Sequence, residues 1–173
     1  DYLIMDIDPS DETDFEDVIE TALVIKEILD KAEVKSYCKT SGASGLHIYV
    51  PMHAMYEYDK VRSFAELIAL FTQEQLPSTT TVERPLKKRQ NRIYIDYLQN
   101  RRGQTLASVY SVRPVPGATV STPLTWKEVK PGLHPSQFTM FNVPQRVEKM
   151  GDLFSGVLKD RTNLVRALKN LKA

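Results

Sequence analysis

The stretch that decides the fold is an apolar strand carrying two aspartates, Tyr2-Leu3-Ile4-Met5-Asp6-Ile7-Asp8-Pro9. Successive side chains of a strand point to opposite faces, so the apolar odd-numbered residues share one face and both aspartates share the other. Two carboxylates on one face repel each other unless a cation lies between them. Hard oxygen ligands of this kind suit Mg²⁺ or Mn²⁺. Taken alone, the pattern fits equally well a solvated strand end followed by a helix cap.

Length and composition predict one globular domain over residues 1–173. The chain is 42% hydrophobic and 26% charged, and its net charge is only +1. The single cysteine, Cys38, excludes an internal disulfide and suits a reducing cytosol. No apolar run approaches the roughly 20 residues of a membrane span, so no membrane partner is expected. Because the chain opens inside a strand without a methionine, we expect it to be part of a longer protein.

The spacing of apolar residues predicts an alternating order of strands and helices. Helical periodicity follows the first strand over residues 15–29, after a cap at Ser10 or Asp11, and again after a cap at Asp59. Further strands are predicted at 34–40, 46–50 and 92–98, and a loop or short edge strand at 78–90. The order β-α-β-β-α-β is the split βαβ, ferredoxin-like or RRM-like plan of the α+β class. A short strand at 110–113, a loop at 114–123 and helices at 143–158 and 161–171 form a C-terminal extension.

This plan brings distant polar residues together. Its sheet order places the first strand between the third and the last, with helices on one face and the other face open. Alternation then directs Asp6, Asp8, His47 and Asp96 to the open face of three adjacent strands. An isolated aspartate or histidine in a strand is usually structural, but this shared face indicates a functional site.

A basic segment precedes the last strand of this plan. Its cationic residues are Arg84, Lys87, Lys88, Arg89 and Arg92. Such a run is either a solvated loop or a surface that contacts phosphates of a nucleic acid.

Four separated motifs resemble the polymerase domain of bacterial ligase D, within the archaeo-eukaryotic primase superfamily. In chain order they are Asp6-Ile7-Asp8, Ser41-Gly42-Ala43-Ser44-Gly45-Leu46-His47, Asp96-Tyr97-Leu98-Gln99-Asn100 and Tyr110-Ser111-Val112-Arg113. The resemblance extends to about residue 158 and implies a domain that lacks the family's N-terminal subdomain. We therefore expect that this portion could be inactive in isolation.

The resemblance implies a template-directed nucleotidyltransferase that extends DNA ends during non-homologous end joining. It implies Mn²⁺ or Mg²⁺ as cofactors and a nucleoside triphosphate as substrate. The expected partners are a DNA primer-template with its 5′-phosphate, the end-binding protein Ku, and linked ligase and nuclease domains. The expected location is the bacterial cytoplasm, in association with the nucleoid.

Residue roles carry over motif by motif. Asp6, Asp8 and Asp96 would be the catalytic, metal-binding triad, with Gln99 nearby. The triphosphate would be bound by Ser41, His47 and Arg113, and by backbone N–H groups of the turn that contains Gly42 and Gly45. In this interpretation His47 and Arg113 neutralise the charge that builds up on the pyrophosphate leaving group.

One residue departs from the family pattern. Many family members have lysine where this chain has Ser44. The loss of that charge would weaken nucleotide binding unless a residue such as Lys39 or Arg102 compensates.

Two other functions fit part of the pattern. A non-catalytic RRM-like module could stack bases on Tyr49 and Tyr94 of the open face, although acids on that face would repel phosphates. A haloacid dehalogenase-type phosphatase also opens with Asp-x-Asp. That fold requires alternating β and α units, whereas residues 34–50 predict two consecutive strands.

Overall fold

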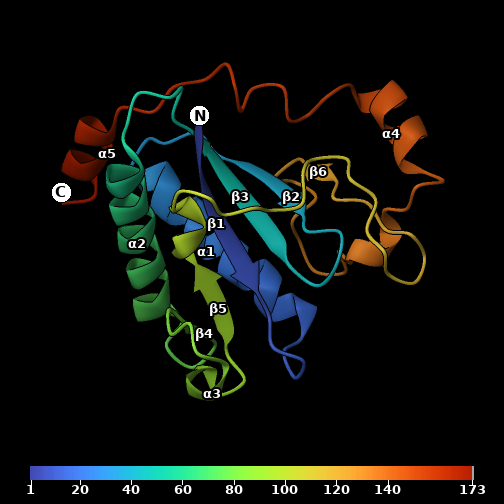
Figure 1. Ribbon diagram of the computed structural model, residues 1–173, viewed down its shortest axis with the longest axis horizontal. Coiled ribbons are helices and arrows are strands. Elements are labelled where there is room, and N and C mark those ends of the chain that lie inside the picture. Colours follow the sequence, from blue (N-terminus) through green and yellow to red (C-terminus); the bar gives the residue numbers. More distant parts are fainter. Residues whose placement is uncertain (173) are drawn as a thin grey trace.

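The strand that carries the two aspartates lies inside a six-stranded sheet (Figure 1). In the computed structural model, which describes residues 1–172, this strand is β1 (Tyr2–Asp8). It pairs antiparallel with β3 (Leu46–Pro51) on one side and with β5 (Ile93–Asp96) on the other. The strand order is β4-β5-β1-β3-β2-β6, where the remaining strands are β2 (Tyr37–Thr40), β4 (Thr80–Thr81) and β6 (Pro123–Leu124).

Two long helices cover one face of this sheet and leave the other face to the polar residues. They are α1 (Phe15–Lys31), which lies behind the strands in Figure 1, and α2 (Tyr58–Gln75), which stands to the left of the strands there and packs against α1. Leu3, Met5 and Ile7 are fully buried in the core beneath them. Burying each such side chain stabilises the fold by about 1.5–3 kcal/mol, which fixes the register of β1 because a one-residue slip would expose all three.

The predicted α+β split βαβ plan is confirmed. Antiparallel pairing of β1 on both sides is incompatible with the parallel, alternating sheet of a dehalogenase-type phosphatase. The boundaries of the elements differ in detail from the prediction. The N-cap of α1 is Asp14, not Ser10 or Asp11, and the N-cap of α2 is Glu57, not Asp59.

The last predicted strand is shorter than expected. It ends at Asp96, because the Asp96 carboxylate accepts a hydrogen bond from the Leu98 N–H and caps the 3₁₀ helix η1 (Tyr97–Asn100). The Asn100 side chain then takes the place of a neighbouring strand. Its amide accepts from the Ile4 N–H at 2.8 Å and donates to the Ile4 carbonyl at 2.7 Å, so β1 stays paired beyond the end of β5.

The C-terminal extension is less regular than predicted. Residues 110–113 form only an isolated bridge between Val112 and Val120, whereas β6 begins at the last residue of the predicted loop and pairs with β2. The two terminal helices are short. They are α4 (Val143–Met150) and α5 (Leu164–Asn170), and the 3₁₀ helix η2 (Pro135–Gln137) precedes them. The basic segment holds a further short helix, α3 (Leu86–Arg89).

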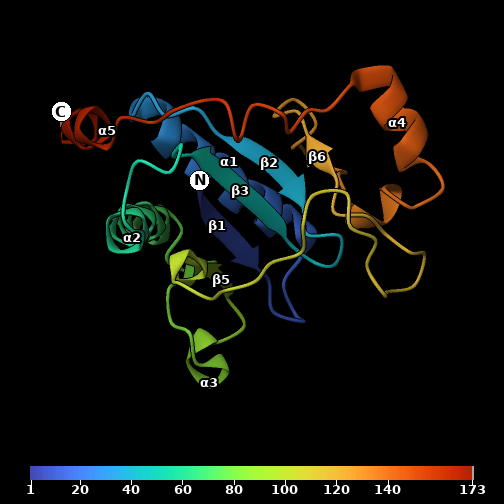
Figure 2. The ribbon, with the colours of Figure 1, turned by 45° about the horizontal axis from the view of Figure 1, so that its top comes forward.

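The segment between η1 and residue 113 crosses the open face of the sheet (Figures 1 and 2). It reaches the far strands, where the Ala107 carbonyl accepts a hydrogen bond from the Lys39 side chain of β2. No helix in the described part of the chain is both long enough and apolar enough to span a membrane.

The Gly45→Ala substitution is expected to destabilise the protein by about 1–3 kcal/mol, the usual range for overpacking. A methyl group on Gly45 would lie 2.2 Å from the Ile7 carbonyl oxygen, so β1 and the turn before β3 would have to separate. Urea unfolding measures the change. The neighbouring Ser44→Ala is the control, because Ser44 is exposed. Equal stability of Gly45→Ala and the wild type would contradict the close approach.

Candidate active site

Asp6 occupies the middle of a row of polar side chains that crosses three strands. Its Cα is opposite that of His47 in β3 and opposite that of Asp96 in β5. Asp8 follows two residues later on the same face, opposite Tyr94. The sheet thus brings the three predicted carboxylates and the predicted histidine to adjacent positions on the open face, as strand alternation predicts.

The Asp6 carboxyl group is held in an environment that opposes its ionisation. Burial raises its pKa to about 7, and the negative charges of Asp8 and Asp96 act in the same direction. The charge of Lys39 and a hydrogen bond from Gln99 offset part of this effect. The pKa shift therefore marks a place where negative charge exceeds the positive charge that the protein supplies.

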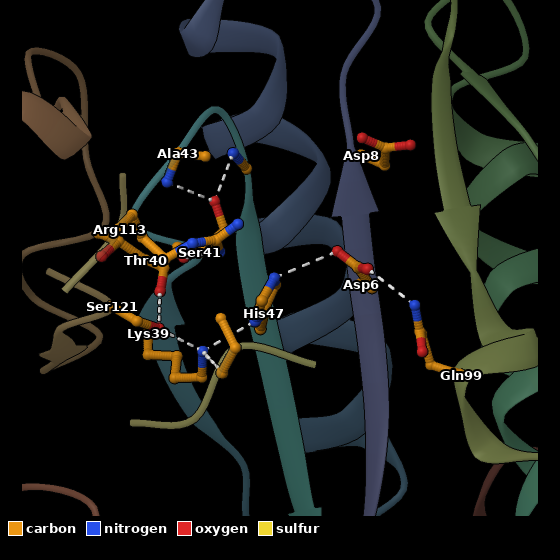
Figure 3. Close-up of polar contacts among 12 residues, drawn as sticks. Asp6, Asp8, Lys39, Thr40, Ser41, Ala43, His47, Gln99, Arg113 and Ser121 are labelled. Carbon is orange, nitrogen blue, oxygen red and sulfur yellow. Dashed lines mark hydrogen bonds and ion pairs between the residues drawn. The ribbon is translucent and has the colours of Figure 1, made fainter. Parts of the chain in front are cut away.

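Asp8 faces away from Asp6 in Figure 3 and pairs with a residue of the basic segment. Arg89 Nη1 lies 2.8 Å from Asp8 Oδ2, and its guanidinium also stacks over the ring of Tyr94. Among residues 1–172, no three acidic, histidine or cysteine side chains are gathered into a group that could hold a metal ion. The triad predicted from sequence is thus placed on adjacent strand positions, but its side chains are not gathered into a cage.

Asp96 has a structural role in addition to its predicted one. Its Oδ1 accepts hydrogen bonds from the Leu98 N–H at 2.8 Å and the Tyr94 hydroxyl at 3.1 Å. Both bonds use the same oxygen. The carboxylate is therefore fixed in orientation by the start of η1.

A polar cavity of about 260 Å³ lies beside Asp6, towards β2. The turn before β3 forms one wall, and within it Ser41 Oγ accepts hydrogen bonds at 3.0 Å from the N–H groups of Ala43 and Gly45 (Figure 3). The Gly45 N–H, which sequence reasoning assigned to phosphate binding, is thus engaged within the turn. Ser44 lines the same cavity and is exposed.

The two glycines of this turn permit close packing. Gly42 has a positive φ of +75°, and a Cβ there would lie 2.7 Å from the Arg113 side chain. Gly42 does not line the cavity; it lets Arg113 pass beneath the turn. Arg113 Nη1 donates to the Ser41 carbonyl at 2.9 Å, which fixes the guanidinium at the cavity wall.

His47 lines the cavity and is neutral at pH 7. Burial lowers its pKa well below the ordinary value, and the charges of Lys39 and Arg113 act in the same direction. The 3.3 Å approach of its Nε2 to Asp6 Oδ1 is therefore a polar contact and not an ion pair. Arg113 alone carries the positive charge that sequence reasoning assigned to both residues.

Sequence reasoning missed the structural role of Lys39. Its side chain is fully buried in β2 and contacts His47, and burial lowers its pKa to about 7 while the Asp6 charge opposes this shift. Neither Lys39 nor the exposed Arg102 lines the polar cavity. The compensation expected for Ser44 is therefore not provided by these two residues.

Gln99 lies next to Asp6, as predicted, and donates to its carboxylate at 3.4 Å. Its Oε1 is buried and has no hydrogen-bond partner among the described residues. Gln99 also lines a second, larger cavity of about 480 Å³. The two cavities share the rim residues Thr105 and Leu106 of the crossing segment.

The structure divides the basic segment into two parts. Arg84, Lys87 and Lys88 are exposed. In contrast, Arg89 pairs with Asp8, and Arg92 donates to backbone carbonyls of residues 77 and 89. The predicted DNA-binding set therefore consists of an outward-facing group and an inward-facing group.

Comparisons with known proteins agree with this architecture. Residues 1–154 match the model of the LigD primase-polymerase domain family. The chain is 36% identical over 150 residues to a bifunctional non-homologous end joining protein LigD of Bacillus subtilis, covering 86% of this chain and 24% of that protein. It is 28% identical over 150 residues to a multifunctional non-homologous end joining protein LigD of Pseudomonas aeruginosa, covering 87% and 18%.

Among solved structures, the chain resembles a polymerase domain from Mycobacterium tuberculosis ligase D in complex with DNA. The TM-score is 0.85 at 25% identity, and the match covers 93% of this chain and 56% of that chain. This chain thus spans a quarter or less of the two relatives named above and about half of the solved domain. With a family match over most of its length, the chain belongs to the LigD primase-polymerase domain family.

Proposed function

We propose that this chain is the catalytic part of a nucleotidyltransferase that adds nucleotides to DNA ends during non-homologous end joining. The observation that carries the proposal is the position of Asp6, between Asp96 on one strand and a polar cavity on the other side. A reaction that joins a primer 3′-hydroxyl to a nucleoside triphosphate needs carboxylates next to a phosphate pocket.

The acidic residues fit a pair of divalent cations, Mn²⁺ or Mg²⁺. Asp6, Asp8 and Asp96 offer hard oxygen ligands, and the raised pKa of Asp6 reflects its burial and the repulsion from the other two carboxylates, both of which a bound cation would offset. When bound, such cations stabilise the attacking and leaving oxygens of a phosphoryl transfer. Asp8 would join the other two carboxylates after exchanging Arg89 for a cation.

The polar cavity is the proposed site for the triphosphate. Arg113 would bring positive charge to the phosphates, and its bond to the Ser41 carbonyl holds it ready in that position. His47 would donate a neutral hydrogen bond. Ser41, Gly42 and Gly45 would act chiefly by shaping the turn, because the Ser41 hydroxyl holds two of its N–H groups.

The exposed part of the basic segment is the proposed contact with DNA. Arg84, Lys87 and Lys88 lie at the end of the molecule that holds α3, on the β5 side of the carboxylates (Figure 1). Arg89 and Arg92 would contribute only after leaving their partners within the protein. We further propose that the chain works within a longer protein that also carries ligase and nuclease domains, and that this protein acts together with Ku.

The geometry argues against the non-catalytic RRM-like alternative. An RRM stacks bases on exposed aromatic rings of the open face. Here Tyr49 and Tyr94 are only 4% and 2% exposed. Tyr49 packs edge-on against Tyr2 and Phe154, and Tyr94 lies beneath Arg89.

Asp6→Asn is expected to reduce nucleotide addition by about 10³-fold or more, because it removes a charged ligand while keeping the shape of the side chain. Extension of a labelled primer with Mn²⁺ measures the rate. The folded state should be equally or more stable in urea. Because the pKa of Asp6 is raised on folding, its ionisation destabilises the folded protein above the pKa of the unfolded chain, and asparagine avoids that cost.

The control for this variant is Asp11→Asn, which removes an exposed carboxylate just beyond β1. It should leave the rate and the stability unchanged. Wild-type activity in Asp6→Asn would refute the assignment of the carboxylates.

The double variant Lys87→Gln/Lys88→Gln is expected to weaken binding to gapped duplex DNA and to reduce the salt dependence. The slope of log Kd against log salt concentration should fall by about 2, since each lysine that contacts a phosphate contributes about one unit. Fluorescence anisotropy across a salt series measures the slope. The matched control, Lys169→Gln/Lys172→Gln, removes two exposed lysines around α5. If both double variants behaved alike, α3 would not be the contact.

A further inference from the structure

The buried amine of Lys39 links three separate segments behind the polar cavity. Its side chain is 0% exposed, and its Nζ lies 2.8 Å from His47 Nδ1, 3.0 Å from the Ala107 carbonyl and 2.5 Å from Ser121 Oγ (Figure 3). A lysine is rarely this buried, because burying an ammonium costs free energy unless all of its protons find acceptors.

Two of the three partners can only be acceptors for Lys39. A carbonyl oxygen such as that of Ala107 has no proton to donate. The Ser121 hydroxyl already donates its proton to the Thr40 carbonyl at 2.9 Å, so its oxygen accepts from Lys39. An ammonium has three N–H donors and no lone pair, so its third N–H is left for His47 Nδ1.

The opposite side of the imidazole ring leads to the same assignment. His47 Nε2 lies 3.3 Å from Asp6 Oδ1. If Nε2 carried a lone pair, it would face the lone pairs of the ionised Asp6 carboxylate, whereas an Nε2–H is attracted to that carboxylate. The charge of Lys39 is favoured further by the ring of Tyr49, whose centroid lies 5.7 Å from Nζ.

We propose that Lys39 is a positioning residue that holds His47 in the tautomer with its proton on Nε2. In the free protein that N–H points towards Asp6 at the wall of the polar cavity, and on binding of a nucleoside triphosphate it turns to a phosphate oxygen as its acceptor. The nucleotide part of this inference rests on the proposed function, whereas the tautomer does not. The partner of the second ring nitrogen commonly sets the tautomer of a site histidine.

The same amine fixes the rim of the cavity. Ala107 lines the cavity at the end of the segment that crosses the open face. Ser121 belongs to the segment that lies beside the end of β2, since its hydroxyl donates to the Thr40 carbonyl. Lys39 thus orients the histidine and ties it to two of the surrounding segments.

Nitrogen NMR of the chain with ¹⁵N-labelled histidine tests the tautomer directly. The chain has three histidines, and the His47 signals are those lost in His47→Asn. At pH 7 we expect Nδ1 to resonate as an unprotonated nitrogen and Nε2 as a protonated one. A proton on Nδ1 would mean that Lys39 is a neutral amine that accepts a hydrogen bond from His47, and this result would overturn the proposal. The measurement uses the wild-type chain, so it does not depend on the folding of any Lys39 variant.

Lys39→Met tests whether the lysine is the cause. In the folded variant His47 should shift to a mixture of tautomers, because Nδ1 has lost its donor. Lys35→Met is the matched control, since Lys35 lies just before β2 and its side chain is 65% exposed. An unchanged Nε2–H tautomer in folded Lys39→Met would overturn the role of Lys39.

Steady-state nucleotide addition provides the functional readout. Lys39→Met should lower kcat/KM for the triphosphate by about 10- to 100-fold, the range typical of residues that orient a site histidine. In a protein that already carries His47→Asn, Lys39→Met should lower kcat/KM little further, because the two residues act as one unit. If the losses of transition-state stabilisation in the two single variants simply added up in the double variant, Lys39 would not act through His47, and that part of the proposal would be overturned. An inactive wild type with the Nε2–H tautomer would count against the proposed function and support the tautomer.

Discussion

The antiparallel pairing of β1 with both of its neighbours is the constraint on which the rest of the structure depends. Fully buried Leu3, Met5 and Ile7 lock β1 in register, because any one-residue slip would exchange them for the polar face. Asp6 is thereby placed opposite His47 and opposite Asp96 at once. The hydrophobic core thus determines which polar groups meet on the opposite face of the sheet.

Charge is distributed unevenly across this polar row. The β1–β5 side holds three carboxylates, and Asp6 is left with a raised pKa. The β2 side holds Lys39 and Arg113, each tied to backbone carbonyls. Such an arrangement is costly for the isolated protein, since burial and like charges both oppose ionisation. A cation on one side and a triphosphate on the other would relieve both costs, which is the physical reason to regard the row as a binding site.

Sequence patterns were sufficient for the parts of this site that depend on strand alternation. Side chains alternate between the two faces of a strand, and the split βαβ plan sets the order of the strands. Together these two rules predict that one face of the sheet carries Asp6, Asp8, His47 and Asp96. The contacts of Lys39 and Arg89 could not be predicted in this way. Lys39 meets residues 68 and 82 positions away, and Arg89 meets Asp8 across 81 positions. Such contacts depend on where loops cross the sheet. The two-residue strand β6 carries too little periodicity to be detected.

The two halves of the row differ in how far they are organised. On the side that is proposed to bind the triphosphate, Ser41, Arg113 and Lys39 are held by hydrogen bonds to the backbone or to one another's segments, so little rearrangement would be needed on binding. On the side that is proposed to bind metal ions, Asp96 is fixed by η1, but Asp8 is held by Arg89, whose own segment carries the exposed lysines. A movement of that segment on contact with DNA would therefore change the partner of Asp8. The structure in this way couples the carboxylates to the surface that is proposed to bind DNA, and Asp8, which also lines the polar cavity, extends this coupling to the proposed phosphate pocket.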